Sequence, residues 1–108
     1  MGGQNRPPTF TSQLNNNSMF TSTMNKGFQL TFENGWTISV QWGPGNYCEK
    51  RNMGNFNEPA SRIKWESLTA EIAIWKGTSD HTFENGDIVK GHLTTNEVAE
   101  WITKVSMW

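Results

Sequence analysis

The chain has 108 residues, a formal net charge of −1 and a hydrophobic fraction of 34%. This length suits one domain with a modest core. The near-neutral charge argues against a protein that coats nucleic-acid polymers or anionic membranes. Six Trp and six Phe concentrate apolar area in few side chains, and each buried aromatic removes ~150–250 Å² from water. A small aromatic core is therefore expected.

Cysteine usage and hydropathy indicate where the chain works. Cys48 is the one cysteine of the sequence, so it cannot form an internal disulfide, and a lone thiol fits a reducing cytosol. No apolar run approaches the length of a membrane span, and the N-terminus lacks the apolar core of a signal peptide. We expect a cytoplasmic protein without a membrane partner.

The first 18 residues are rich in Gly, Gln, Asn, Ser, Thr and Pro. Such a segment buries too little apolar area to offset the entropy lost on ordering. The composition predicts a flexible arm over residues 1–18, with Phe10 as an anchor, followed by a single domain over residues 19–108.

Asn34-Gly35, between two runs of β-branched and aromatic residues, is a strong hairpin signal. A two-residue loop would mix apolar and polar side chains on each face. A three-residue loop, with Gly35 in the left-handed conformation, places the apolar side chains on one face. Because a one-residue slip moves a whole apolar set across the sheet, we predict the second register. Its cross-strand pairs are Phe32–Trp36, Leu30–Ile38 and Phe28–Val40.

Three further extended segments are expected in the second half. Residues 68–75 alternate as a strand, and the small alanines there suggest close approach by another element. A turn around Gly77 leads to residues 81–83, which could return as a short strand. Residues 88–93 form another short strand or extended connector.

The string Thr-Phe-Glu-Asn-Gly occurs twice, at 31–35 and 82–86. Trp36 and Ile38 follow the first copy, whereas Asp87 follows the second. Because the surroundings differ, we interpret the repeat as recurring turn chemistry and not as an internal duplication.

The C-terminus carries a clear helix signal. Thr94 with Glu97 three residues later forms a capping box. The apolar residues recur at helical spacing. They are Val98, Trp101, Ile102, Val105 and Trp108. Hairpin, strands and one terminal helix together predict an α+β fold with the helix packed on an antiparallel sheet. One helix cannot cover so much aromatic sheet surface, so a homo-oligomer is expected.

A glycine-rich loop, Gly43-Pro44-Gly45-Asn46-Tyr47-Cys48, follows the hairpin within an unusually long connection. Glycines permit close backbone approach, exposed N–H groups can hold an anion, and Arg with aromatic rings suits phosphate and base. A plain strand exit, or an interface rich in Trp and Arg, would give the same composition. The predicted ligand-binding residues are Trp42, Gly43, Gly45, Asn46, Tyr47, Arg51, Arg62 and Trp65.

No catalytic or metal-binding motif is present. Cys48, His81 and His92 invite a thiol or metal-dependent enzyme, but no local sequence indicates an activated thiolate. The spacings typical of zinc sites are also missing. We therefore predict no catalytic residues, no metal and no cofactor, and favour a binding protein.

Three segments carry a resemblance to a known group of proteins. They are MFTSTMNKGFQLTFENGWTISVQWGPGNYCEKR at 19–51, TAEIAIW at 69–75 and GHLTTNEVA at 91–99. In these segments the chain resembles a family of small bacteriophage accessory proteins. The resemblance covers most of the chain after residue 18. It implies a phage origin and an accessory role in the host cytoplasm, and it supplies no fold, site or activity.

The leading functional hypothesis is a protein that sequesters a nucleotide-derived small molecule, such as a host defence signal, without catalysis. Tyr47 and a tryptophan would stack on the base, while Arg51 and the loop backbone would hold phosphate. Two alternatives remain open at this point. One is a protein–protein inhibitor or adaptor acting on a host protein, and the other is a small thiol- or metal-dependent enzyme.

Overall fold

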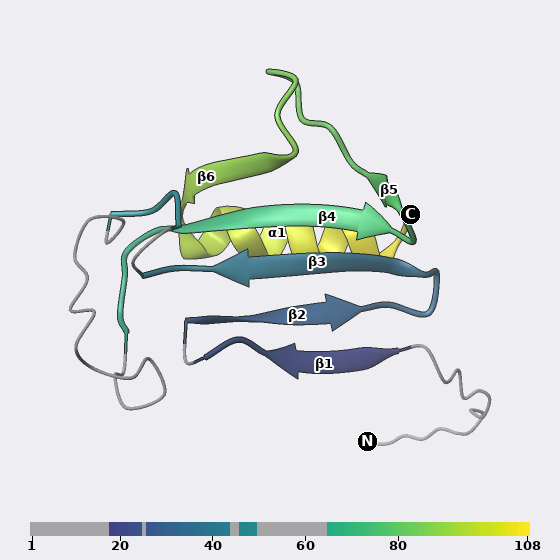
Figure 1. Cartoon of the computed structure of the whole chain (residues 1–108), viewed down its shortest axis with the longest axis horizontal. Helices are drawn as coiled ribbons and strands as arrows, with labels where there is room; N and C mark the ends of the chain where they lie inside the picture. Colours follow the sequence, from purple (N-terminus) through teal and green to yellow (C-terminus); the bar gives the residue numbers. More distant parts are fainter. Residues whose placement is uncertain (1–17, 25, 44–45, 50–64) are drawn as a thin grey trace.

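The computed structural model describes residues 18–24, 26–43, 46–49 and 65–108. These residues form an antiparallel sheet with one helix packed on it, so the predicted α+β class is confirmed (Figure 1). The elements are β1 (Met19–Ser22), β2 (Gly27–Thr31), β3 (Trp36–Gln41), β4 (Ala70–Lys76), β5 (Ser79–Asp80), β6 (Val89–Leu93) and α1 (Thr95–Ser106). No helix in these ranges is long and apolar enough to cross a membrane.

The sheet runs in the order β1-β2-β3-β4, and β5 and β6 pair with the remaining edge of β4. β5 pairs with the end of β4 at Trp75 and Lys76, and β6 pairs with its start between Ala70 and Ala73. The connection of β3 to β4 includes the residues between 50 and 64, which lie outside the described ranges. β3 and β4 are the two most buried strands of the sheet. They pair with each other although a long connection separates them in the sequence.

The central hairpin adopts the register with all apolar side chains on one face. Phe28 lies opposite Val40, and Leu30 lies opposite Ile38. The Phe32 N–H donates to the carbonyl of Trp36 at 2.9 Å. Gly35 has φ +90°, the left-handed conformation that a three-residue loop requires. The predicted register and the bulged loop are both confirmed.

Both copies of the repeated string build the same turn. The Gly35 N–H donates to the Phe32 carbonyl at 2.9 Å, and the Gly86 N–H donates to the Phe83 carbonyl at 2.8 Å. Gly86 has φ +87°, close to the value at Gly35. The first copy joins two strands, and the second lies between β5 and β6 without flanking strands of its own. The interpretation as recurring turn chemistry agrees with this arrangement.

Two elements differ from the expected ones. Strand β1 pairs with β2, Phe20 lying opposite Leu30, although its four residues carried no sequence signal. The prediction of a strand at 81–83 is wrong, because the chain returns along β4 only at Ser79–Asp80. The His81 N–H still donates to the Ile74 carbonyl, but Phe83 then turns into the core as a loop residue. The flexible arm, the Phe10 anchor and most of residues 1–18 lie outside the described ranges.

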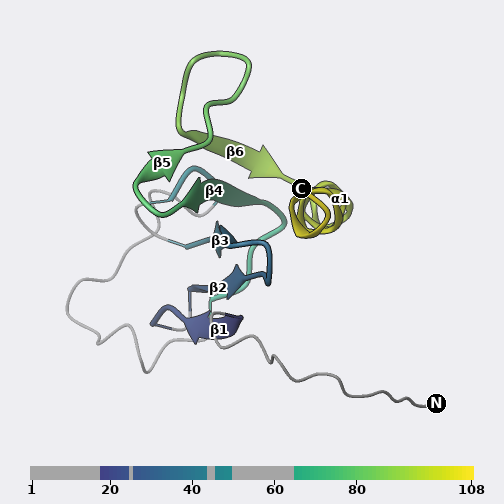
Figure 2. The ribbon, with the colours of Figure 1, turned by 90° about the vertical axis from the view of Figure 1, so that its right-hand side faces the viewer.

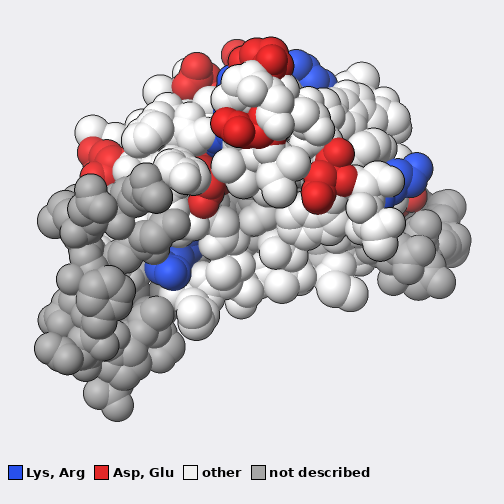
Figure 3. Space-filling model, turned by 45° about the horizontal axis from the view of Figure 1, so that its top comes forward, with Lys and Arg blue, Asp and Glu red and all other residues white. Residues whose placement is uncertain are grey.

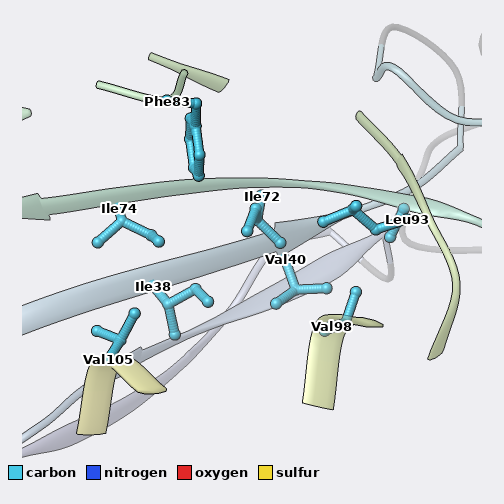
Figure 4. Packing of buried hydrophobic residues seen from close by; sticks show 9 residues of the cluster. Ile38, Val40, Ile72, Ile74, Phe83, Leu93, Val98 and Val105 are labelled. Atoms are coloured by element: carbon cyan, nitrogen blue, oxygen red, sulfur yellow. The ribbon is translucent and has the colours of Figure 1, made fainter. Parts of the chain in front are cut away.

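Helix α1 begins and packs as its sequence predicts. The Thr94 side chain accepts from the Glu97 N–H, and the Glu97 carboxylate accepts from the Thr94 N–H, which completes the capping box. Val98 and Val105 are the buried residues of the helix. Figure 4 shows them pointing toward the side chains of the sheet, which form the centre of the core. These are Ile38, Val40, Ile72 and Ile74.

The other face of the sheet is polar but not uniformly exposed. Thr37 and Ser39 are buried in the central strand β3. Their hydroxyls are satisfied within the sheet, as buried polar groups require. Thr37 Oγ1 lies 2.8 Å from Thr31 Oγ1, and Gln41 Nε2 donates to Ser39 Oγ at 3.1 Å. This row of hydroxyls replaces the apolar contacts that the opposite face makes.

Acidic residues outnumber basic ones in the described ranges. Nine Asp and Glu residues lie there, with four lysines, Lys26, Lys76, Lys90 and Lys104. Figure 3 shows charged side chains gathered in the upper part of that view, above a broad uncharged surface. The other five of the nine basic residues of the chain lie outside the described ranges, before residue 18 and in residues 50–64. The described part is therefore a poor anion-binding surface by itself.

Candidate functional site

An apolar pocket lies between the sheet and the N-terminal end of α1. It encloses about 390 Å³, within the range of ~300–1,000 Å³ typical of small-molecule sites. Phe28, Val40 and Trp42 line it from the β2–β3 hairpin, and Val98 lines it from the helix. Residues 65–70, which lead into β4, form the remaining wall. The pocket thus lies where the helix begins and where the chain returns to the sheet.

Hydrogen bonds hold the wall segment 65–69 in place at both ends. At one end the Trp42 indole N–H donates to the Trp65 carbonyl at 2.8 Å. At the other end Glu49 Oε1 accepts from the Leu68 N–H at 2.7 Å, and the Glu49 N–H donates to Thr69 Oγ1 at 2.9 Å. The pocket is therefore formed by a segment that is fastened before any ligand arrives, which reduces the ordering cost of binding.

Gly43 allows the chain to leave β3 beside this wall. Its φ is +92°, and a side chain at this position would lie 3.4 Å from the Trp65 ring and from the stem of Lys26. The Cys48 Sγ accepts from the Gly43 N–H at 3.2 Å and donates to its carbonyl at 3.5 Å. Only 2% of Cys48 is exposed. The thiol closes the turn from inside.

A bulge in β6 contacts the turn formed by residues 46–49. Ala70 lies opposite Leu93 while Ile72 lies opposite Lys90, so β6 carries one extra residue there. His92 has φ +56°, and its N–H donates to the Tyr47 carbonyl at 2.9 Å. Gly91 lies so close to Tyr47 that a methyl group would be 2.5 Å from the Tyr47 Cβ. The β6 bulge therefore supports the 46–49 turn.

The structure brings together some of the predicted ligand-binding residues. Trp42 and Trp65 line the pocket, and Gly43 lies against Trp65. Asn46 faces back into the turn, where its Nδ2 donates to the Trp42 carbonyl at 2.9 Å. Tyr47 does not line the pocket, because its backbone is held against β6. Gly45, Arg51 and Arg62 lie outside the described ranges.

Several lining residues were absent from the sequence prediction. Phe28, Val40 and Val98 were predicted as core, and they form the pocket because the core remains open at this end. The one signal for the wall was Leu68, a large apolar residue that is 76% exposed at the rim. Because Leu68 begins a predicted strand, the sequence pattern assigns it to the sheet and not to a pocket wall. No local pattern could show that Thr95 of the helix lines the same pocket as Leu68.

Charge at the pocket disfavours an anion in its interior. Glu66 is part of the lining, and Glu49 and Glu97 lie in the flanking segments. The stem of Lys26 and the ring of Trp65 both lie beside Gly43. A neutral ring suits the interior, and a negative group would have to point outward, away from Glu66.

Catalytic and metal-binding alternatives gain nothing from the described residues. A thiol as buried as Cys48 cannot be reached by a substrate, and it is already engaged by Gly43. Within the described ranges no three His, Cys, Asp or Glu side chains are close enough together to hold a metal ion. His81 instead contacts the rings of Phe83, Trp101 and Trp108.

Comparison with known proteins returned no matching family model, no similar curated protein and no similar solved structure.

Proposed function

We propose that this protein is a non-catalytic binding protein whose apolar pocket takes the planar ring of a nucleotide-derived small molecule. One observation carries the proposal. Trp42 and Trp65, 23 positions apart, meet at a pocket of about 390 Å³ whose remaining lining is mostly apolar and small, with Phe28 as a third ring and Glu66 as the charged residue. Base–aromatic stacking contributes ~1–3 kcal/mol per base and tolerates any ring with a π-face.

The Trp42 ring is held in position without a ligand. The Trp42 indole N–H is already bonded to the Trp65 carbonyl, so its ring orientation is set in the free protein. Phe28 packs edge-on against Trp42, with ring centroids 6.3 Å apart at 69°. Binding a ring here costs little side-chain entropy, because the aromatic surface is organised in advance.

Charge sets the orientation of the ligand. With Glu66 in the lining, the base and sugar enter the pocket and the phosphate points outward. The stem of Lys26 lies beside Gly43. The sequence also supplies four cations in the adjoining segment, Lys50, Arg51, Arg62 and Lys64. Arg51 and Arg62 keep the phosphate-binding role that the sequence predicts, since an Arg side chain can hold a phosphate with two parallel hydrogen bonds.

The resemblance to phage accessory proteins suggests a biological role for this binding. A small protein without catalytic groups acts by occupancy, so it lowers the free concentration of its ligand in proportion to its own abundance. In an infected host cell this would remove a nucleotide-derived defence signal from its receptor.

Calorimetry tests the proposal directly. The panel comprises mononucleotides, cyclic mono- and dinucleotides, and ADP-ribose derivatives, each titrated into the whole chain. We expect one class to bind in the micromolar range or tighter. Titrations that release no heat across this panel at several temperatures would reject the proposal.

A pair of matched variants assigns the binding to this pocket. Leu68→Asp places a charge at the rim, at a side chain that is 76% exposed, so folding is preserved. Ile88→Asp makes the same change at a residue that is 52% exposed and does not line the pocket. We expect Leu68→Asp to weaken binding at least ~10-fold and Ile88→Asp to leave it unchanged. Equal effects would place the ligand elsewhere.

A further inference from the structure

The helix covers only part of the apolar face of the sheet. α1 lies close to β3, β4 and β6 and to neither β1 nor β2. Figure 2, which looks along the strands, shows the helix beside β4 and β3 and no helix beside β2 and β1. The apolar set nevertheless continues across β2 onto β1, because Leu30 lies opposite Ile38 on one side and Phe20 on the other.

This uncovered surface, which we call the apolar step, is formed by Phe20, Leu30 and Phe32 beside the helix. Phe20 is 88% exposed, while Leu30 and Phe32 are half-buried. Between these side chains and Ser106 at the end of α1 lies a hollow of about 420 Å³. An exposed Phe next to further apolar residues is typical of an interaction site.

We propose that the apolar step binds the apolar step of a second copy of this chain, face to face about a twofold axis parallel to the strands. Two sheets pack face to face ~10 Å apart, and a helix with its side chains is ~10–12 Å across. The β1–β2 hairpin of the partner would therefore lie level with α1 and fill the step beside it. The same operation places each helix along the outer edge of the other copy's β1.

The outer edge of β1 gives independent support. No other strand in the described ranges pairs with it, since β1 is the first strand of the sheet order. Its sequence, Met-Phe-Thr-Ser, has neither a charged residue nor a proline, the features that natural edge strands use against uncontrolled pairing. In the proposed dimer a helix covers this edge, which makes such protection unnecessary.

The composition of the surface favours the apolar step of a second copy as the binding partner of the apolar step. The helix of a second copy cannot fill the step, because its outward side is polar and exposed at Glu97, Glu100, Thr103 and Lys104. None of Phe20, Leu30 and Phe32 carries a charge, and Glu33, the charged residue that lines the hollow, is exposed. The apolar centres of two copies therefore meet without repulsion. We estimate that each copy offers roughly 300 Å² there, below the ~800 Å² per partner of a standard interface. The dimer is therefore weak and depends on concentration.

Sedimentation velocity across the micromolar range tests the dimer. The wild-type chain is expected to shift from monomer to dimer as its concentration rises. Phe20→Asp places a charge at the centre of the interface and, at an 88% exposed position, leaves the fold intact, as circular dichroism would verify. We expect it to raise the dissociation constant at least ~10-fold. A wild-type chain that stays monomeric throughout would overturn the proposal and leave the step to another partner.

Two control variants separate the face from the edge. Thr21→Asp lies next to Phe20 in the exposed strand β1, and its side chain points to the opposite face. In face-to-face packing it should leave the dimer intact, whereas pairing of β1 with β1 at the edge would be disrupted by it. Ile88→Asp controls for an added charge far from the step. A dimer that Phe20→Asp leaves unchanged, or that Thr21→Asp weakens equally, would contradict the proposed geometry.

Discussion

Asn34 connects the hairpin turn to the end of the helix, and its substitution tests how much that connection contributes to stability. Its Oδ1 accepts from the Trp36 N–H at 3.0 Å, which is ordinary turn chemistry. Its Nδ2 donates to the Val105 carbonyl at 2.9 Å and to the Trp108 carbonyl at 3.1 Å. Carbonyls at a helix C-terminus have no partner further along the helix. The Val105 carbonyl accepts from the Trp108 N–H at 3.2 Å, and Asn34 adds a second donor from 71 positions earlier.

The second copy of the repeated string offers a matched control. Asn85 Oδ1 accepts from the Asp87 N–H at 3.1 Å, and its Nδ2 donates to Asp87 Oδ2 at 2.9 Å, within the same turn. Both alanine variants lose the turn bond, and only Asn34→Ala loses two bonds to the helix end. At ~0.5–1.5 kcal/mol for each hydrogen bond, and with one of the two exposed, Asn34→Ala should cost about 1–2 kcal/mol more than Asn85→Ala.

Urea unfolding followed by tryptophan fluorescence measures both variants. In a domain of this size each kcal/mol corresponds to a shift of ~4–8 °C in Tm, so thermal unfolding provides a second reading. Hydrogen exchange at the last turn of α1 should accelerate in Asn34→Ala alone. Equal losses of stability in the two variants would refute the reasoning, because they would show that the helix end gains nothing from the hairpin turn.

Three further changes have defined outcomes. Thr94→Ala removes the capping hydroxyl of α1 and should lower the free energy of unfolding by ~1 kcal/mol; a loss within the error of urea unfolding would contradict the cap. Gly91→Ala places a methyl group 2.5 Å from the Tyr47 Cβ, so amide exchange at residues 46–49 should accelerate while α1 stays protected, and unchanged exchange would count against this contact. The hydrogen bond and charge of Lys90 lower the pKa of Glu84, so Lys90→Met should raise that pKa toward its ordinary value. Because the pKa of Glu84 is lower in the folded state, its ion pair stabilises the fold above the unfolded-state pKa, and this contribution is lost as the pH falls through the folded-state pKa. Glu84 is exposed, so NMR titration of its carboxyl group is the measurement. An unmoved pKa would contradict the ion pair.

The hairpin register and the helix were predictable because each rests on local chemistry. Asn34-Gly35 specifies the turn, the alternation specifies the face, and Thr94 with Glu97 specifies where the helix begins. These signals lie within a few residues of the structure they determine. They required no knowledge of what the rest of the chain does.

Strand β1 and the pocket were not predictable, because both depend on distant parts of the chain. Four residues without charge become a strand only because β2 offers them an edge. Trp42 and Trp65 were predicted as ligand-binding residues from composition, and they meet through a side-chain to backbone bond that no spacing indicates. The prediction that residues 81–83 form a strand was wrong: Phe83 is a buried loop residue whose ring packs edge-on against Trp101, a contact with a helix 18 positions later that no local pattern indicates. Gly45, Arg51 and Arg62 lie outside the described ranges, so their predicted role stays a prediction.

The buried thiol of Cys48 makes the pocket's supporting turn observable. Since Cys48 is the one cysteine of the chain and is almost fully buried, a thiol reagent can reach it only when its surroundings open locally. Its rate of labelling under native conditions therefore reports the free energy of that local opening. The turn also fastens the wall segment at Leu68 and Thr69, so a bound ligand should slow the reaction. The rate of Cys48 modification thus reports local opening beside the pocket without an introduced probe.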